Sequence, residues 1–262
     1  MNPYEGTPAK ILAITRQTAT DWTFRLACPH TPQPGQFFEV SLPRVGEGPI
    51  SICGLGDGFV EMTIRRVGKV TAAIFELHEG DTLYLRGPYG HGFDLPNYNG
   101  KHLVVLAGGT GLAPVRGVIQ HFVARRGQLK AFDVVLGFKS PGDILFRSEI
   151  DQWAKGADVR ITVDKADETW TGPVGVITTL LADVPMPQLA DVSAIVVGPP
   201  AMMKFCLRSL LDRGLSPEQI WVSYERRMSC GLGKCGHCKI NGKYVCLDGP
   251  VFNYTQAQWL VD

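Results

Sequence analysis

The sequence lacks the features of a membrane protein or a nucleic-acid-binding protein. Its 262 residues contain no apolar run that approaches the length of a membrane span, and Met1–Gly6 contains no apolar signal core. The formal net charge is +1, so no broad basic surface is available for nucleic acid or an acidic membrane. Internal repeats and low-complexity segments are also absent from the sequence. We therefore expect a globular, cytoplasmic protein that binds neither membranes nor nucleic acid.

Cysteine is scarce over most of the chain and concentrated near its end. The total is seven, an odd number that argues against a disulfide framework in a chain of this length. Three are scattered and are expected to be small buried apolar residues, namely Cys28, Cys53 and Cys206. The other four follow the spacing C-x4-C-x2-C-x7-C and are Cys230, Cys235, Cys238 and Cys246.

The spacing of these four cysteines predicts a [2Fe–2S] site. The first three match the C-x4-C-x2-C run of plant-type clusters. Gly231, Gly233 and Gly236 stand between the ligands, where they allow the loop to wrap tightly and turn N–H groups toward the sulfurs. A four-thiolate zinc site is the alternative, although zinc sites more often pair two C-x2-C arms across a longer gap. A thiolate site of either kind fits a reducing cytoplasm.

The region before Pro96 is predicted to be β-rich. Short strand-like runs are bounded by proline and glycine, and the run from Phe59 to Val67 alternates between apolar and polar residues. The expected strands are Ala9–Thr15, Asp21–Ala27, Gln36–Leu42, Phe59–Val67 and Thr82–Arg86, with one helix at Val70–Leu77. Closely spaced strands with turn signals indicate a barrel or a sandwich.

After the turn-forming stretch Pro96–Gly100 the pattern changes to alternating strands and helices. The expected strands are Leu103–Ala107, Phe132–Gly137, Val159–Val163, Ala194–Val197 and Gln219–Ser223, and the expected helices include Leu145–Ala154, Val176–Leu181 and Ala201–Arg213. Such alternation predicts a parallel sheet covered on both faces. The tail Asn253–Val261 is expected to form a closing helix. We predict three segments: a β-barrel domain at 1–98, an α/β domain at 99–224 and a cysteine-containing appendix at 225–262.

Two glycine-rich turns at strand ends predict a nucleotide site. Gly108–Pro114 directly follows the first buried strand and opens a helix, so its backbone N–H groups suit a phosphate. Val197–Met203 repeats this arrangement at a later strand. Neither segment is the G-x-G-x-x-G fingerprint or a P-loop, and a plain structural turn is the alternative for each.

Two segments of the β-rich region also suit a cofactor. Gly48–Ser51 is an extended stretch that suits contact with a flat ring, and Arg65–Thr71 is a basic stretch before a helix that suits a pyrophosphate. Taken singly, each is more often a turn and a helix cap.

Together these features resemble the ferredoxin-NADP reductase superfamily, in which a flavin-binding β-barrel and a nucleotide domain with G-G-T-G-x-x-P carry an electron-transfer appendix. The motifs C-G-x-G-x-C-G-x-C and V-C-x-D-G-P resemble the branch of electron-transfer subunits of dihydroorotate dehydrogenase, cytoplasmic sulfhydrogenase (gamma) and anaerobic sulfite reductase (B). The flanking strings are most similar to the sulfite reductase B subunits. They run nearly end to end and are Val40–Glu47, Pro49–Ser51, Val67–Thr71, Val196–Pro200, Gln219–Val222, Tyr224–Met228, Gly233–Cys238 and Phe252–Tyr254.

The resemblance implies a role for each motif. Pro49, Ile50 and Ser51 would border the isoalloxazine ring and ribityl chain of FAD. The flavin's phosphates would be held by Thr63, Ile64, Arg65, Gly68, Lys69, Val70 and Thr71. The nicotinamide dinucleotide would lie against Gly108, Gly109, Thr110, Gly111, Gly198, Pro199 and Met202. The [2Fe–2S] cluster would be ligated by Cys230, Cys235, Cys238 and Cys246.

Two positions depart from the pattern of many relatives. Gly48 stands where many carry an arginine before the flavin motif, which shifts that charge role to Arg44 or Arg65. Val197 stands where many carry a cysteine near the hydride path. We therefore assign no side chain as a general acid or base, since hydride transfer depends on ring alignment more than on proton chemistry.

The resemblance implies an NADH-dependent flavoprotein oxidoreductase that acts as an electron-transfer subunit. NADH would reduce FAD, and single electrons would pass through the [2Fe–2S] cluster to iron–sulfur and sirohaem-containing partner subunits that reduce sulfite to sulfide. NADH is preferred over NADPH because Phe138–Ser140, after the second nucleotide strand, offers one cation and no arginine cluster. The alternatives are a dihydroorotate dehydrogenase or hydrogenase partner, a standalone NADH:ferredoxin reductase, and a zinc-stabilised regulatory module without flavin.

Overall fold

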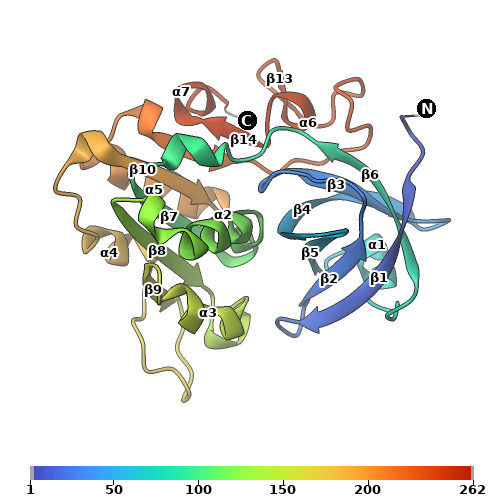
Figure 1. The fold of residues 1–262 in the computed structure, drawn as a ribbon, viewed down its shortest axis with the longest axis horizontal. Coiled ribbons are helices and arrows are strands. Elements are labelled where there is room, and N and C mark those ends of the chain that lie inside the picture. Colours follow the sequence, from blue (N-terminus) through green and yellow to red (C-terminus); the bar gives the residue numbers. More distant parts are fainter. Residues whose placement is uncertain (1–2, 261–262) are drawn as a thin grey trace. The chain divides into compact units, whose positions relative to one another are not determined.

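Six antiparallel strands close into a barrel in the N-terminal part of the chain (Figure 1). The computed structural model describes residues 3–260. The strands pair in the order β1-β2-β5-β4-β3-β6, and β6 pairs back to β1. Their bounds are β1 Thr7–Arg16, β2 Asp21–Ala27, β3 Phe37–Leu42, β4 Gly46–Gly56, β5 Phe59–Arg65 and β6 Thr82–Tyr89. The predicted β-barrel is confirmed.

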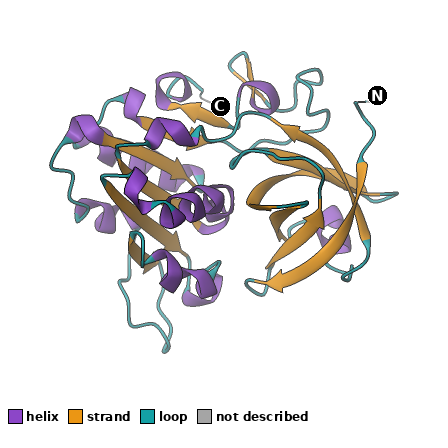
Figure 2. Ribbon diagram, in the orientation of Figure 1, coloured by secondary structure: helices purple, strands orange, loops and turns teal. Residues whose placement is uncertain are grey.

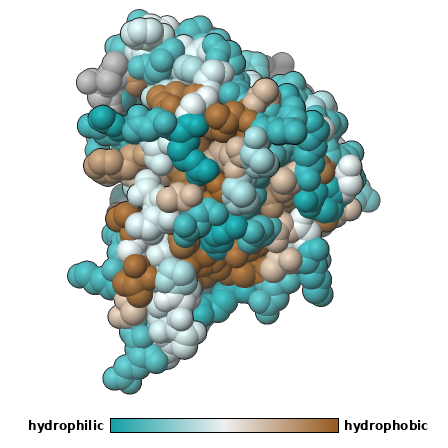
Figure 3. Space-filling model, turned by 90° about the vertical axis from the view of Figure 1, so that its left-hand side faces the viewer, coloured by the Kyte–Doolittle hydropathy of each residue, from teal (hydrophilic) through white to brown (hydrophobic). Residues whose placement is uncertain are grey.

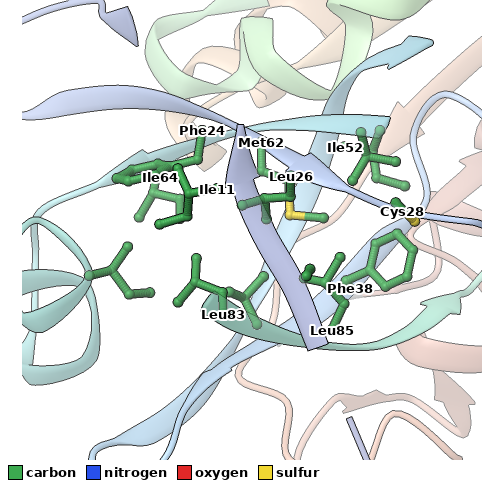
Figure 4. Packing of buried hydrophobic residues seen from close by; sticks show 14 of the residues in the cluster. Ile11, Phe24, Leu26, Cys28, Phe38, Ile52, Met62, Ile64, Leu83 and Leu85 are labelled. Atoms are coloured by element: carbon green, nitrogen blue, oxygen red, sulfur yellow. The ribbon is translucent and has the colours of Figure 1, made fainter. Parts of the chain in front are cut away.

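Apolar side chains on alternating strand positions fill the barrel. In Figure 4 they point toward one another from different strands, among them Phe24 and Leu26 of β2, Phe38 of β3 and Met62 of β5. Each of these four side chains is 0% exposed. Burying side chains of this size contributes about 1.5–3 kcal/mol each before the entropy of ordering them is counted. The short helix α1 (Lys69–Ile74) adds Ile74 to the same core.

Strand β4 is absent from the sequence prediction, which left Gly46–Gly56 outside the expected strands. Its glycines and proline hide the alternation that identifies the other strands. The alternation is nevertheless present, since Ile50 and Ile52 pack with the barrel core while Ser51 between them faces away. The pairing of β4 with β5 is interrupted by a register shift between Ile52 and Gly54.

A six-stranded sheet forms the second part of the fold, in the order β14-β11-β10-β7-β8-β9. The bounds are β7 His102–Gly108, β8 Ala131–Phe138, β9 Asp158–Val163, β10 Val192–Val197, β11 Ile220–Ser223 and β14 Val251–Asn253. The five strands from β11 to β9 are parallel to one another, as the sequence predicts.

Helices cover this sheet (Figure 2) and are α2 Leu112–Ala124, α3 Arg147–Trp153, α4 Ile177–Ala182 and α5 Pro200–Asp212. Helix α2 packs with α3, and α4 packs with α5. The chain runs from β7 outward to β9 and then returns to the other side of β7, so right-handed crossovers place these two pairs on opposite faces. The central strand β7 is completely covered along its length.

Contacts divide the chain into two units. One contains Met1–Phe93 with Tyr224–Val251, and the other contains Asp94–Ser223 with Phe252–Trp259. The cysteine segment thus has its contacts mainly with the barrel rather than forming a third unit of its own. The three segment boundaries given by the sequence remain predictions.

The C-terminal segment differs from its prediction. The expected helix at Asn253–Val261 is instead the end of strand β14 followed by the short helix α7 (Tyr254–Ala257), and Val261 lies outside the described residues. Asn253 caps this helix by accepting a hydrogen bond from Thr255 N–H at 3.1 Å. The hairpin of β12 (Lys239–Ile240) and β13 (Lys243–Tyr244) was also unpredicted.

Buried charges are paired between neighbouring strands of the parallel sheet. Asp133 of β8 lies 2.6 Å from Nε2 of His102 on β7 and accepts a hydrogen bond of 2.5 Å from Arg160 on β9. Burial alone would raise the pKa of Asp133, but the hydrogen bonds and charges of His102 and Arg160 outweigh it and lower that pKa. These three side chains connect neighbouring strands near their N-terminal ends.

Within residues 3–260, no helix combines the length and the apolar character needed to cross a membrane. The side of the molecule drawn in Figure 3 mixes hydrophobic and hydrophilic residues. Large apolar side chains that are exposed include Val174, Val176 and Phe205 of the α/β unit.

Candidate cofactor and metal sites

The four clustered cysteines lie on a loop that directs backbone N–H groups at their sulfurs. Cys230 Sγ accepts hydrogen bonds from the N–H groups of Leu232 at 3.3 Å, Lys234 at 3.4 Å and Cys235 at 3.4 Å. Cys246 Sγ accepts one from Gly233 N–H at 3.2 Å. Such bonds stabilise the negative charge that thiolate ligands carry, and they are a main influence on cluster potential.

The glycines between the cysteines allow this wrapping. Gly231 and Gly233 both have φ of +67°, and Gly236 has φ of +82°, in the left-handed region that residues with a Cβ rarely adopt. A Cβ on Gly231 would lie 2.5 Å from the ring of Tyr89, and one on Gly233 would lie 2.2 Å from Leu247. The role given to these glycines from the sequence therefore agrees with the backbone.

The thiols form two pairs. Cys238 and Cys246 have their sulfurs 3.3 Å apart, and the Cys235 N–H donates a hydrogen bond to Cys230 Sγ at 3.4 Å. In the described part of the chain, no three Cys, His, Asp or Glu side chains converge on a single metal-ion position. Two pairs of thiols suit the two irons of a [2Fe–2S] cluster better than one tetrahedral zinc ion. The residues present therefore fit the cluster.

Exposure distinguishes one ligand from the others. Cys230, Cys238 and Cys246 are buried, whereas Cys235 is exposed. Hydrogen bonds from the backbone at His237 and Cys230, together with the Cys230 thiol, lower the pKa of Cys235. Burial, followed by the neighbouring Cys238 thiol, raises the pKa of Cys246 to about 12. The cluster site thus opens to solvent on its Cys235 side.

The predicted flavin motif lies on β4 and presents two of its three side chains away from the barrel core. Ile50 packs against that core, so its proposed contact with the flavin would come from its backbone. Pro49 and Ser51 alternate with Ile50 and face the other side of the sheet. Pro49 is directly opposite Glu39 of β3, and Ser51 is directly opposite Phe37.

The residues predicted to hold the flavin's phosphates are already engaged in part. Arg65 binds Asp21 through two hydrogen bonds of 2.7 and 3.0 Å, so its guanidinium is oriented by that carboxylate. The hydroxyl of Thr71 accepts hydrogen bonds from the N–H groups of Val67 and Gly68, each at 3.0 Å. Ile64 is 0% exposed in the core. Gly68 is the N-cap of α1 and Lys69 is its first residue, and their contact with a phosphate stays a prediction.

Gly48, where many relatives carry arginine, faces open space. A Cβ built on it would meet no atom within 4 Å. Arg44, which the sequence suggested for the charge role of that missing arginine, lies in the turn between β3 and β4 with φ of +66°. The backbone at Gly48 thus has room for the side chain that this protein lacks.

The two predicted nucleotide turns meet at the switch point of the parallel sheet. Strands β7 and β10 are neighbours, and the chain leaves them in opposite directions, to β8 and to β11. In sheets of this kind, ligands bind beyond the carboxyl ends of the strands at that point. A Cβ on Gly111 would lie 2.6 Å from the carbonyl oxygen of Val197 and 2.7 Å from Gly198. Glycine at 111 therefore allows the two turns to touch.

The sulfur of Met202 lies close to the same turns. A Cβ on Gly108 would lie 2.2 Å from the Met202 sulfur, and a Cβ on Gly198 would lie 2.7 Å from the Met202 methyl group. The structure thus brings together Gly108, Gly111, Gly198 and Met202, all assigned from the sequence to the nicotinamide dinucleotide. Val197, at the end of β10, is 2% exposed and offers no chemistry in place of a cysteine.

Three residues that contact the cluster loop or lie beneath it belong to no motif of the sequence and were not predicted. Arg86 of β6 donates hydrogen bonds to the carbonyl oxygens of Ser229 at 2.7 Å and Cys230 at 2.5 Å. Tyr89 packs on Gly231. Glu39 is 0% exposed, and within residues 3–260 its carboxylate has no hydrogen-bond partner. Burial, and then the nearby Glu47, raise the pKa of Glu39 to about 7, although Arg86 opposes this.

Two protein families match the chain. Residues 105–208 match the oxidoreductase NAD-binding domain, and residues 225–258 match the iron–sulfur cluster binding domain of dihydroorotate dehydrogenase B. The second match contains all four clustered cysteines, and the first contains both nucleotide turns.

Named relatives extend over almost the whole chain. It is 38% identical to the sulfhydrogenase 2 subunit gamma of Pyrococcus furiosus over an alignment of 283 positions, which covers 98% of each chain. It is 36% identical to the sulfhydrogenase 1 subunit gamma of the same organism, over 97% of this chain and 92% of the relative. It is 33% identical to the probable electron transfer subunit of dihydroorotate dehydrogenase B from P. furiosus, over 85% of this chain and 80% of the relative.

Solved structures show the same fold. An NADH-dependent reduced ferredoxin-NADP oxidoreductase superposes with a TM-score of 0.78 at 23% identity and covers 96% of this chain and 91% of its own. The ferredoxin reductase in carbazole 1,9a-dioxygenase superposes with a TM-score of 0.71 at 26% identity, over 81% of this chain and 67% of its own. These matches support the three predicted cofactors, NADH, FAD and an iron–sulfur cluster.

Proposed function

From the premise that this chain belongs to the family that includes sulfhydrogenase gamma subunits and dihydroorotate dehydrogenase B electron-transfer subunits, we propose that it transfers electrons from NADH to a partner subunit. FAD in the barrel and a [2Fe–2S] cluster on the cysteine loop would carry the electrons. When bound, these groups supply two-electron oxidation of NADH followed by one-electron transfer onward.

One observation supports the proposal, namely that the cysteine loop packs on the barrel face that carries the predicted flavin motif. Pro49 of β4, Glu39 of β3 and Arg86 of β6 lie directly opposite one another across three neighbouring strands. Residues opposed in this way point to the same face of a sheet. Arg86, at the end of this row, binds the carbonyl oxygen of Cys230. Strands are spaced about 4.8 Å apart, so the row spans roughly 10 Å.

The nucleotide turns would bind the dinucleotide through the backbone. Gly111 ends the 3-10 turn Gly109–Gly111 and is the N-cap of α2, so this turn lies at a helix N-terminus, where the helix dipole favours a phosphate. Close packing of Gly111 on Gly198 would let one ligand contact both turns. We propose NADH rather than NADPH because Lys139 is the single cation in the Phe138–Ser140 segment, with no arginine cluster for a 2′-phosphate.

Electrons would leave the cluster on the side of Cys235. That ligand is exposed, and Leu247, which follows the ligand Cys246, is 48% exposed. Exposed lysines on the same loop and hairpin are Lys234, Lys239 and Lys243. A partner with an acidic rim around an apolar centre would complement this surface.

Sulfite reduction at a sirohaem in a partner subunit is our first proposal for the terminal reaction. It rests on the strings that flank the motifs, such as Tyr224–Met228 and Phe252–Tyr254, which resemble anaerobic sulfite reductase B subunits. A hydrogenase partner is the second candidate, favoured by the 38% identity to a sulfhydrogenase gamma subunit. A dihydroorotate dehydrogenase partner is a third, favoured by the match of residues 225–258.

Co-purification from the native organism separates these candidates. The tagged chain would be isolated anaerobically, and its partners identified by mass spectrometry and assayed for NADH-dependent sulfite reduction, hydrogen production and orotate reduction. We expect sirohaem in the complex and sulfide as the product. Recovery of nickel–iron or dihydroorotate dehydrogenase subunits, with no sulfite-dependent oxidation of NADH, would reject the sulfite assignment and retain the electron-transfer role.

A further inference from the structure

A buried arginine of the barrel holds the cluster loop. Arg86 is 6% exposed, and its guanidinium donates to the carbonyl oxygens of Cys230 at 2.5 Å and Ser229 at 2.7 Å. The planar guanidinium suits this task because its donors have a fixed geometry that can serve two acceptors at once. The chain just after Cys246 is attached through a backbone hydrogen bond, in which the His91 N–H donates to the carbonyl oxygen of Gly249 at 2.6 Å.

Arg86 is itself positioned by two further side chains. It donates to Glu47 of β4 at 2.9 Å and to the Tyr89 hydroxyl at 2.9 Å. Tyr89 in turn packs on Gly231, the residue after the first cysteine, and on the ring of Phe37 at 5.8 Å between centroids. Arg86 therefore connects the strand of the flavin motif, through Glu47, with the backbone of the first cluster ligand.

The charge of Arg86 matters as well as its geometry. Reduction adds one negative charge to an iron–sulfur cluster, and a nearby buried cation favours the reduced state. Glu47 forms an ion pair with Arg86, and its side chain is 37% exposed. Its negative charge disfavours the reduced cluster and so opposes the effect of Arg86. With about 10 Å between a unit charge and the cluster, and an effective dielectric of about 20, that charge changes the one-electron reduction constant of the cluster roughly tenfold.

We propose that Arg86 is a positioning residue for electron transfer, which fixes the Cys230 end of the cluster loop against the flavin-bearing face of the barrel and makes the cluster easier to reduce. The inference rests on the proposed function, because it takes the four cysteines as ligands of a [2Fe–2S] cluster. Glu47 is its electrostatic counterpart, with the opposite effect on the cluster.

Four variants of the full chain, purified anaerobically with flavin and cluster, test the proposal. They are Arg86→Gln, Arg86→Lys, Glu47→Gln and the control Arg25→Gln, which removes a guanidinium bound to Glu61 on the β2–β5 side of the barrel. Iron per chain and visible absorption report cluster content. A reductive titration followed by electron paramagnetic resonance gives the midpoint potential of the cluster. Rapid mixing with NADH separates flavin bleaching from cluster reduction.

The proposal predicts opposite shifts. Arg86→Gln should lower the one-electron reduction constant of the cluster about tenfold, which corresponds to about 59 mV, and should slow cluster reduction while flavin bleaching is unchanged. Glu47→Gln should raise that constant by a similar factor. Arg86→Lys should keep the potential closer to that of the wild type, and Arg25→Gln should change nothing.

An unchanged potential in both Arg86→Gln and Glu47→Gln, with full iron content, would overturn the proposal. If neither Arg86 variant retains iron, Glu47→Gln decides: a raised potential supports the role of the pair, and an unchanged or lowered potential rejects it. Failure of the proposed function itself would be visible earlier, as wild-type protein whose cluster and flavin do not respond to NADH.

Discussion

Gly111→Ala is the substitution that most directly tests the nucleotide site. The added Cβ would lie 2.6 Å from the carbonyl oxygen of Val197 and 2.7 Å from both Cα and N of Gly198. These neighbours are backbone atoms of a strand end, so they cannot rotate away as a flexible side chain can. The turn at Gly198 must therefore move away from Gly111, and the contact between the two nucleotide turns is lost.

The size of the effect follows from the overpacking. Inserting one extra carbon into a tightly packed site costs about 1–3 kcal/mol. The free energy of unfolding of Gly111→Ala should fall by that amount, measured by urea denaturation. If NADH must restore the close contact to bind both turns, its Kd should rise by roughly 5- to 150-fold. Calorimetric titration with NAD⁺, which avoids turnover, measures that change.

Gly127→Ala is the matched control in the same unit, because a Cβ at that position would meet no atom within 4 Å. It should change neither the stability nor the dinucleotide affinity. A Gly111→Ala protein that loses stability but binds the dinucleotide with wild-type affinity would refute the assignment of these turns. A variant with unchanged stability would refute the packing argument itself.

Three further predictions concern other parts of the molecule. Cys235→Ser should abolish electron delivery to the partner but leave NADH-dependent bleaching of the flavin, and delivery that persists in this variant would reject the cluster route. Asp133→Asn should reduce the free energy of unfolding by about 2 kcal/mol at neutral pH, because hydrogen bonds to a charged group are lost. The folded-state pKa of Asp133 lies below its ordinary value of 3.8, so its contribution is complete above that pH and is lost as the pH falls through the lowered pKa. A difference between the two proteins that does not shrink in acid would contradict this reading. Gly48→Arg should tighten FAD binding by about tenfold or more, since the position is open and a hydrogen bond to a charged group contributes about 1.5–3 kcal/mol. Unchanged FAD retention on gel filtration would show that this position does not face the flavin.

The cluster loop was the part most readily predicted from the sequence. Ligand spacing is a local property, and the positive φ angles at Gly231, Gly233 and Gly236 agree with what a tightly wrapped loop requires. The positions of the two glycine-rich turns were also predictable, because each directly follows a buried strand, and their role in binding a nucleotide stays a prediction. That Gly111 contacts Gly198 could not be predicted, since it depends on β10 lying next to β7 rather than next to β9.

Other features depend on contacts between distant parts of the chain. Arg86 has no local signature, because it follows an ordinary strand pattern and its bond to Cys230 spans 144 positions in sequence. Glycines and a proline conceal strand β4, which is a strand because it pairs with both β3 and β5. At the C-terminus, the expected helix is shortened because the chain first adds β14 to the sheet beside β11.

The central claim is that electrons pass from NADH through this chain to its cysteine cluster. The measurement that tests it most directly is the visible absorption spectrum of anaerobically purified protein, taken before and after NADH is added. The account predicts flavin bands with an iron–sulfur shoulder, both bleached by NADH, together with two irons per chain. A protein that contains zinc, has no visible absorption and does not respond to NADH, when prepared under conditions that preserve clusters, would contradict it.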